Sequence, residues 1–195
     1  MSEPGTIEHA VAAAIVCLQA ANRRFALVGG LAVSVRAQVR FTRDVDLAVQ
    51  VTSDADAEGL VFNLKAAGYQ PVATVEHEQR HRLSTIRLLS PWGVKIDLLF
   101  ASSGIEMEVV ERATTVLLPH AGDVPVAEAE ELLAMKVLSM TDRRLQDRMD
   151  ALQLIACNPK LDLARVRANL RSISERGYDR GEDLEGKLAA LLGAS

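Results

Sequence analysis

The segment at residues 44–51 reads DVDLAVQV and alternates polar and apolar side chains over its first residues. In an extended chain Asp44 and Asp46 fall on one face, and the valine and leucine residues between them fall on the other. A period of two with one apolar face predicts a strand that is buried on one side. Both carboxylates then point away from the buried face, only two residues apart.

Two carboxylates at this spacing repel each other, and one would be protonated unless a cation neutralised the pair. Oxygen ligands of this kind suit Mg²⁺, which binds one or two carboxylates together with substrate phosphates. A third candidate, Asp97, lies on the polar face of the strand predicted at residues 94–100. If the two strands are neighbours, three carboxylates converge, and two metal ions could hold the attacking and leaving oxygens of a phosphoryl transfer.

A glycine pair precedes the first acidic strand. Residues 25–28 form a short apolar run that predicts a strand, Gly29 and Gly30 end it, and a helical pattern follows. Glycine lets the backbone approach a phosphate, and the first N–H groups of a helix are hydrogen-bond donors. The thirteen residues between Gly30 and Asp44 leave room for one short helix and a return.

The rest of the chain separates strands from helices. Before residue 127 the pattern predicts helices at 6–22, 54–67 and 105–113, strands at 69–75 and 83–89, and two further strands around a turn at 120–123. After it, helices alone are predicted, at 128–141, 143–157, 161–176 and 183–192. We therefore expect an α+β fold, with a core at residues 1–127 and a helical C-terminal portion at residues 128–195.

Composition excludes several classes of protein. With 49% hydrophobic and 25% charged residues, the chain is neither disordered nor collagen-like. Its apolar runs are too short to span a membrane, and its acidic start does not read as a secretory signal. Cys17 and Cys157 lie in apolar stretches and are predicted to be buried and reduced, which favours a cytoplasmic protein.

The formal net charge of −4 argues against strong nonspecific nucleic-acid binding by the whole surface. Residues 143–180 differ from the rest, because they carry nine Lys/Arg and five Asp/Glu. The simplest interpretation is a set of solvated helix faces, and the alternative is a surface that faces a polyanion.

The stretch GGLAVSVRAQVRFTRDVDLAV resembles the signature of the polymerase-β-like nucleotidyltransferase superfamily. Its run from Arg40 through Thr42 to the paired aspartates is similar, more narrowly, to the AbiEii-type, toxin–antitoxin-associated branch. VKIDLLF resembles the strand that carries the third carboxylate. ELLAMKVLSM and RRLQDRMDAL are similar to helical motifs in which a lysine and an aspartate, here Lys136 and Asp147, face the nucleotide. Where many members have serine after the first glycine, this chain has Gly30, so phosphate contact would rest on backbone N–H groups.

The resemblance implies a polymerase-β-like core, a mixed sheet with flanking helices, whose nucleotide cleft is completed by the C-terminal helices. Mg²⁺, or Mn²⁺ in its place, would be held by Asp44, Asp46 and Asp97 against the triphosphate of an NTP. An acceptor hydroxyl would then attack the α-phosphate and expel pyrophosphate. The remaining nucleotide-binding residues implied are Gly29, Gly30, Arg40, Lys136 and Asp147.

The implied acceptor is the 3′ end of a tRNA or a protein hydroxyl, with a cognate antitoxin as partner, and a small-molecule acceptor also stays open. Individual residues have simpler interpretations too. Lys136 could be a surface lysine whose stem covers apolar neighbours, and Asp147 could form an exposed pair with Arg143 or Arg144. Asp97 could be a plain surface carboxylate, and Arg40 could pair with carboxylates instead of phosphate.

Other functions remain open on the sequence alone. A non-catalytic relative could bind a nucleotide or a partner protein without turnover. His77, Glu78 and His81 match the H-E-x-x-H pattern of zinc peptidases, which requires a helix, whereas the flanking residues favour a hairpin. Paired aspartates also occur in metal-dependent glycosyltransferases and in haloacid-dehalogenase-type phosphatases, although the latter want Thr or Val where this chain has Ala48.

Overall fold

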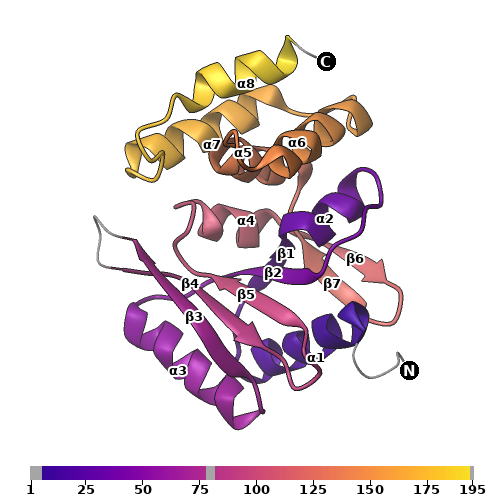
Figure 1. The fold of residues 1–195 in the computed structure, drawn as a ribbon, viewed down its shortest axis with the longest axis vertical. Coiled ribbons are helices and arrows are strands. Elements are labelled where there is room, and N and C mark those ends of the chain that lie inside the picture. The colour runs from indigo at the N-terminus through magenta and orange to yellow at the C-terminus, as the bar shows by residue number, and fades with distance from the viewer. Residues whose placement is uncertain (1–5, 78–81, 194–195) are drawn as a thin grey trace.

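The strands form one mixed sheet in a computed structural model that describes residues 6–77 and 82–193 (Figure 1). The seven strands lie in the order β3-β4-β5-β2-β1-β7-β6. Parallel pairing joins β2 to β5 and β1 to β7, and the other neighbours are antiparallel. The bounds are β1 Phe25–Val28, β2 Asp44–Val49, β3 Gln70–His77, β4 Arg82–Leu89, β5 Lys95–Leu99, β6 Thr114–Leu118 and β7 Gly122–Val126.

Helices cover the sheet in two groups. In Figure 1, α1 and α3 lie below the sheet, and α5 to α8 gather above it with α2 and α4 in between. Helix α2 contacts β1 and β2 on one side and α5 and α6 on the other, so it links the sheet to the upper helices. The bounds are α1 Ile7–Ala20, α2 Gly29–Arg36, α3 Asp54–Ala66, α4 Glu106–Arg112, α5 Ala129–Ser139, α6 Leu145–Cys157, α7 Leu163–Glu175 and α8 Leu184–Leu192.

The expected α+β fold is confirmed, because every strand precedes α5 and the elements lie close to their predicted positions. Strand β2 ends at Val49, two residues earlier than its alternation predicts. The prediction for the cysteines is wrong in part: Cys157 is exposed at the end of α6, and Cys17 is half-buried. The division at residue 127 stays a prediction. Within the described residues, no helix combines the length and apolar character needed to cross a membrane.

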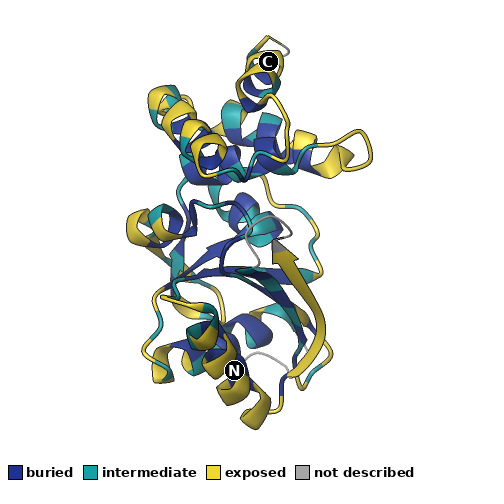
Figure 2. Cartoon of the chain, turned by 90° about the vertical axis from the view of Figure 1, so that its left-hand side faces the viewer, coloured by how far each residue is buried: buried dark blue, intermediate teal, exposed yellow. Residues whose placement is uncertain are grey.

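The core follows the order of the strands. All four residues of β1 are buried, because this strand is central in the sheet and helices pack against it. Figure 2 shows buried residues along the central strands and the inner faces of the helices, and exposed residues on the outer faces. In β2 the first residues alternate, with Val45 and Leu47 fully buried and the two aspartates only half-buried. The polar face of β2 is thus turned toward an accessible part of the molecule.

A buried carboxylate joins the upper helices to α4. Glu131 on α5 has 0% exposure and accepts hydrogen bonds from Arg112 Nη1 at 2.9 Å, Arg165 Nε at 2.8 Å and Asn169 Nδ2 at 3.0 Å. These donors come from α4 and α7, so one side chain connects three helices. Removing one charge from such a buried cluster is destabilising, because it leaves the remaining charges buried without a counter-ion.

We expect Glu131→Gln to lower the free energy of unfolding by about 2 kcal/mol, because the amide takes the counter-ion from Arg112 and leaves Arg165 only its longer pair with Glu130 at 3.9 Å. Urea unfolding followed by circular dichroism measures this difference. The matched control is Glu175→Gln on the exposed end of α7, which should change stability by less than about 0.5 kcal/mol. Equal effects of the two variants would contradict the role given to Glu131.

Candidate active site

Strand register brings the three predicted carboxylates to one face of the sheet. Strands β2 and β5 are parallel neighbours, and Asp46 is directly opposite Asp97 in their register. Residues opposite each other in paired strands project to the same side, and neighbouring strands are about 4.8 Å apart. Asp44 lies two residues before Asp46 on β2 and shares this face. The expectation that the two acidic strands are neighbours is therefore confirmed.

The glycine pair fits tightly against the second carboxylate. Gly29 begins α2 with φ +64, a backbone conformation that is unfavourable for residues other than glycine. A Cβ at Gly29 would also overlap the carboxylate of Asp46. The backbone N–H of Gly30 donates a hydrogen bond to the same carboxylate. The sharp change from β1 to α2 thus places Asp46 against the N-terminus of a helix, where a negative charge is favoured.

Asp46 is the most perturbed acid of this group. Burial raises its pKa from the ordinary 3.8 to about 6, and the nearby charges of Asp97 and Asp44 push it in the same direction. Lys136 and the Gly30 N–H act against this rise. A carboxylate that is costly to ionise gains most from a bound cation. The electrostatics therefore favour a cation beside Asp46.

Asp97 has a cationic partner that sequence reasoning missed. Arg87 on β4 is opposite Asp97 in the antiparallel β4–β5 register. Its guanidinium donates two hydrogen bonds to the carboxylate, from Nε to Oδ1 at 2.7 Å and from Nη2 to Oδ2 at 2.6 Å. The hydrogen bonds to Asp97 raise the pKa of Arg87 above its usual value. Asp97 itself has only 9% exposure, so its interpretation as a plain surface carboxylate is wrong.

Lys136 enters the site from the helical side. It is buried, with 9% exposure, and its Nζ lies 2.8 Å from Asp147 Oδ1 and 2.8 Å from Asp150 Oδ2. The alternative of a surface lysine is therefore wrong. Asp147 also pairs with Arg144 at 2.8 Å, which matches one sequence alternative, but Asp147 is buried and not exposed.

Arg40 reaches the same network from the loop before β2. Its Nη2 donates to Asp150 Oδ2 at 2.8 Å, and its guanidinium occupies the space that a side chain at Gly30 would need. Burial opposes ionisation of Asp150, yet hydrogen bonds from Arg40, Lys136 and Gln146 hold its pKa below the usual range. Of the two interpretations of Arg40, the structure shows a carboxylate partner, although it is Asp150 and neither strand aspartate.

These residues line two adjoining cavities. The first, about 540 Å³, is called the α2 lobe, and Gly30, Arg40, Thr42 and Asp44 line it. The second, about 300 Å³, is called the β4 lobe, and Thr85, Leu99, Ser102, Ser139 and Arg180 line it. The residues that line both lobes are Asp46, Arg87, Asp97, Lys136, Arg144 and Asp147. Asp46 and Asp97 thus lie where a ligand in one lobe meets a ligand in the other, and Asp44 lies beside them in the α2 lobe.

The site suits a divalent cation without forming a complete cage for one. Among residues 6–77 and 82–193, no three His, Cys, Asp or Glu side chains are arranged as a ready metal-binding group. Asp97 is turned to Arg87, which leaves Asp44 and Asp46, the latter already bonded to the Gly30 N–H, as the candidate oxygen ligands. Mg²⁺ commonly takes one or two carboxylates and completes its shell with water and substrate phosphates. The pair, with its raised Asp46 pKa, fits this ion.

The structure gives no support to the zinc-peptidase alternative. His77 is the last residue of strand β3, whereas the H-E-x-x-H motif requires a helix. Glu78 and His81 lie outside the described residues.

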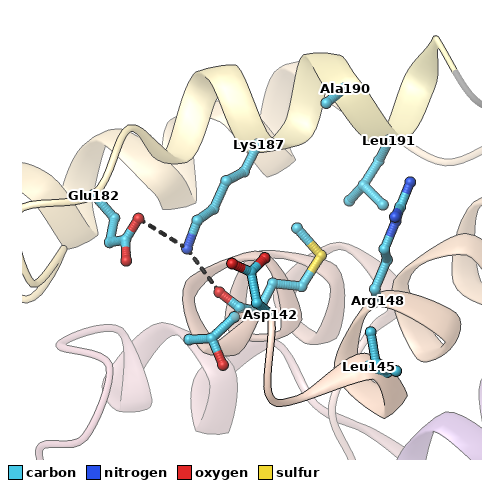
Figure 3. A pocket seen from close by; sticks show the side chains of 9 residues that line it. Asp142, Leu145, Arg148, Glu182, Lys187, Ala190 and Leu191 are labelled. Carbon is cyan, nitrogen blue, oxygen red and sulfur yellow. Dashed lines mark hydrogen bonds and ion pairs between the residues drawn. The ribbon is translucent and has the colours of Figure 1, made fainter.

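A separate cavity of about 480 Å³ lies between the α5–α6 connection and α8 (Figure 3). Its Lys187 donates to the carbonyl oxygen of Met140 at 2.8 Å and pairs with Glu182 at 3.4 Å. None of the three strand carboxylates lines this cavity, so the predicted site lies in the two lobes and not here.

Comparisons with known proteins find a family that matches most of the chain. The family described as "Nucleotidyl transferase AbiEii toxin, Type IV TA system" matches residues 13–190. A comparison with curated proteins finds no significant match.

Solved structures share the fold at low sequence identity. An antigenic nucleotidyltransferase-like protein from Paracoccidioides brasiliensis has a TM-score of 0.52 at 19% identity, over 94% of this chain and 92% of its own. The lincosamide antibiotic adenylyltransferase LnuA, solved with lincomycin bound, has a TM-score of 0.50 at 15% identity, over 78% of this chain and 99% of its own. ANT(2")-Ia in complex with adenylyl-2"-tobramycin has a TM-score of 0.51 at 11% identity, over 90% and 99%. These likenesses concern the fold.

We expect Gly29→Ala to destabilise the protein by about 2 kcal/mol, because the positive φ is strained for alanine and the new Cβ meets Asp46. The control is Gly59→Ala in the middle of α3, where a Cβ has open space, and it should stabilise by about 0.5–1 kcal/mol. Chemical denaturation of both variants measures whether each substitution lowers or raises the free energy of unfolding. Tolerance of alanine at position 29 would contradict the close approach of Gly29 to Asp46.

Asp46→Asn should stabilise the metal-free protein at pH 7.5. At this pH the wild-type carboxylate is ionised, and its ionisation near other acids in the folded protein lowers the free energy of unfolding. A pKa raised on folding to about 6 means that Asp46 contributes stability below pH 4 that is lost as pH rises through 6. The gain at pH 7.5 should be about 1–2 kcal/mol after allowance for partial solvent exposure, and it should vanish near pH 4. Urea unfolding in EDTA at several pH values tests this. A gain that is the same at every pH would contradict the raised pKa.

Proposed function

Since the chain belongs to the AbiEii family of nucleotidyl transferases, we propose that it transfers an NMP from an NTP to an acceptor hydroxyl in a Mg²⁺-dependent reaction. The observation that carries this proposal is the placement of Asp44, Asp46 and Asp97 on one face of β2 and β5, beside the N-terminus of α2. Family membership confirms the predicted resemblance and supports the predicted nucleotidyltransferase activity.

The α2 lobe is suited to the triphosphate. The N-terminus of α2 borders this lobe at Gly30, whose N–H donates to Asp46 in the free protein, and such helix ends favour anions. Lys136 and Arg40 bring cationic groups to the same lobe. Both are held by Asp150 in the free protein, so each is already oriented before the nucleotide arrives.

Asp44 and Asp46 are the residues proposed to hold Mg²⁺, or Mn²⁺ in its place. A divalent cation bound there supplies neutralisation of the triphosphate and polarisation of the α-phosphate. Asp97 lies at the junction of the lobes and is the carboxylate proposed to face the acceptor hydroxyl. For this role its contact with Arg87 must loosen, because Arg87 now occupies both carboxylate oxygens.

In the transfer step the acceptor oxygen forms a bond to the α-phosphorus, and the bond from that phosphorus to the bridging oxygen of pyrophosphate breaks. The hydroxyl proton passes to Asp97 or to solvent. The contribution of the chain is positioning and charge neutralisation, which dominate catalysis of phosphoryl transfer. Lys136 and Asp147 complete the nucleotide site in this proposal.

The biological setting is proposed from the family description. A family of type IV toxin–antitoxin toxins supports a cognate antitoxin as partner. The acceptors under consideration are a tRNA 3′ end and a protein hydroxyl, together with a small molecule. The experiment that separates them incubates the protein with each α-³²P-labelled NTP, Mg²⁺ and cell lysate, and follows the label into RNA, protein or the small-molecule fraction.

Asp44→Asn should reduce transfer of label by at least about a thousandfold, because it removes one of two metal ligands while keeping the side-chain size. Pyrophosphate release measured in parallel reports the same step. The control is Asp123→Asn on β7, an exposed residue that lines neither lobe, which should leave the rate unchanged. An undiminished rate in Asp44→Asn, with circular dichroism unchanged, would remove the assignment.

A further inference from the structure

Strand register places Arg87 in line with two carboxylates of the proposed site. Across β4, β5 and β2, Arg87 is opposite Asp97, and Asp97 is opposite Asp46. Residues opposite each other in paired strands project to the same side, so these three side chains share one face of the sheet. Asp97 therefore lies between a guanidinium on one neighbouring strand and a carboxylate on the other.

Arg87 is held in this place by one partner. Its Nε and Nη2 donate to Asp97 at 2.7 and 2.6 Å, and within the part of the chain that the structure describes Asp97 is its only hydrogen-bond and ion-pair partner. The Arg87 side chain is 41% exposed. Lys136, by contrast, is held by both Asp147 and Asp150, and its side chain is only 11% exposed. Of these two cations, Arg87 can therefore leave with the smaller loss of contacts.

The three strand carboxylates attract Arg87 and a divalent cation alike. The hydrogen bonds to Asp97, together with the negative charges of all three carboxylates, raise the pKa of Arg87. A cation proposed at Asp44 and Asp46 is separated from this guanidinium by the one strand that carries Asp97. Two positive charges this near repel each other, and the repulsion is stronger in a partly buried site than in water. Arg87 in its observed position therefore weakens the binding of a divalent cation.

A bound triphosphate changes this balance. It supplies oxygen ligands and negative charge to the cation, and the α2 lobe proposed for it is lined by Arg87 as well. A phosphate in this lobe offers the guanidinium a second bidentate partner, because arginine pairs with phosphate and with carboxylate through the same pair of N–H groups. Transfer of Arg87 to the phosphate frees both oxygens of Asp97.

We propose that Arg87 is a positioning residue that acts through Asp97 and makes the binding of the divalent cation depend on the binding of the triphosphate. Without nucleotide, Arg87 stays on Asp97, and the strand carboxylates hold a cation only weakly. With nucleotide, Arg87 moves to a phosphate oxygen, the cation binds strongly, and Asp97 becomes available to the acceptor hydroxyl. This inference rests on the proposed nucleotidyl transfer and adds the coupling between its metal and its nucleotide.

Mn²⁺ binding to the full chain, measured by electron paramagnetic resonance without nucleotide, tests this role without turnover. Arg87→Gln removes the charge and keeps a donor for Asp97, and it should lower the Kd for Mn²⁺ by about tenfold. Arg87→Lys keeps the charge and should bind Mn²⁺ as the wild type does. A Kd in Arg87→Gln that equals or exceeds the wild-type value would refute the inference, and so would an equal tightening in Arg87→Lys.

The matched control is Arg82→Gln at the start of the same strand. The Arg82 side chain is 43% exposed, pairs with Asp54 at 3.5 Å and lines neither lobe. Its replacement removes the same charge from a similarly exposed position of β4. We expect the Kd for Mn²⁺ to stay at the wild-type value in this variant.

A second measurement uses the wild type and does not depend on the folding of a variant. The α,β-methylene analogues of the four NTPs, which resist cleavage at the α-phosphate, are titrated by calorimetry with and without Mg²⁺. An analogue that binds should do so at least about tenfold more tightly with Mg²⁺, and because coupling is reciprocal the nucleotide tightens the metal by the same factor. This factor should shrink in Arg87→Gln.

The outcomes separate this inference from the proposed function. Equal affinity of the bound analogues with and without Mg²⁺, or a coupling factor unchanged in Arg87→Gln, would overturn the role of Arg87 and leave nucleotidyl transfer standing. Failure of every analogue to bind, together with absence of pyrophosphate release from every NTP in lysate, would instead refute the proposed function and this inference with it.

Discussion

The constraint behind this site is the pairing of two like charges across a parallel pair of strands. Asp46 and Asp97 are opposite each other in the β2–β5 register, at the spacing of adjacent strands. Two carboxylates that close cannot both ionise cheaply in a partly buried place. Other parts of the chain supply the compensation: Arg87 from β4, Lys136 from α5 and the backbone N–H of Gly30 from α2. Three neighbouring elements thus each contribute a positive or hydrogen-donating group to the same pair of carboxylates.

This compensation extends into the helices as a continuous network. Lys136 bridges Asp147 and Asp150, and Asp150 in turn holds Arg40 over Gly30, beside Asp46. Buried ion pairs are weak contributors to stability, because desolvation offsets most of the Coulombic attraction. A cluster of this size is better explained by the orientation of charged groups toward a ligand. Positioning of Lys136 and Arg40 before a nucleotide arrives is such a task, since it lowers the entropy lost on binding.

The sequence could predict the parts of this site that depend on local periodicity. Alternation in β2 and β5 identified the three carboxylates, and the strand–glycine–helix pattern identified Gly29 and Gly30, because each signal lies within a few residues. Arg87 and Asp150 were missed because their roles depend on contacts between distant segments. Both had a usable signal: Arg87 follows from pairing β4 with β5 as a hairpin, and Asp150 lies three residues after Asp147 on one face of α6. The exposure of Cys157 could not be predicted either, because the neighbouring residues in the sequence do not determine whether an apolar residue at a helix end is buried.

The departure of this chain from the family pattern at Gly30 has a physical reason. A serine at this position would place its Cβ in the space that the guanidinium of Arg40 occupies. Glycine at position 30 and the Arg40–Asp150 pair are therefore mutually dependent: the small residue admits the guanidinium, and Asp150 keeps the guanidinium there. Where a serine would offer a neutral hydroxyl to a phosphate, this arrangement offers a charged, planar donor within the same lobe. In the proposed nucleotide site, Arg40 from the loop before β2 thus takes the place of the missing hydroxyl as a stronger donor to the phosphate.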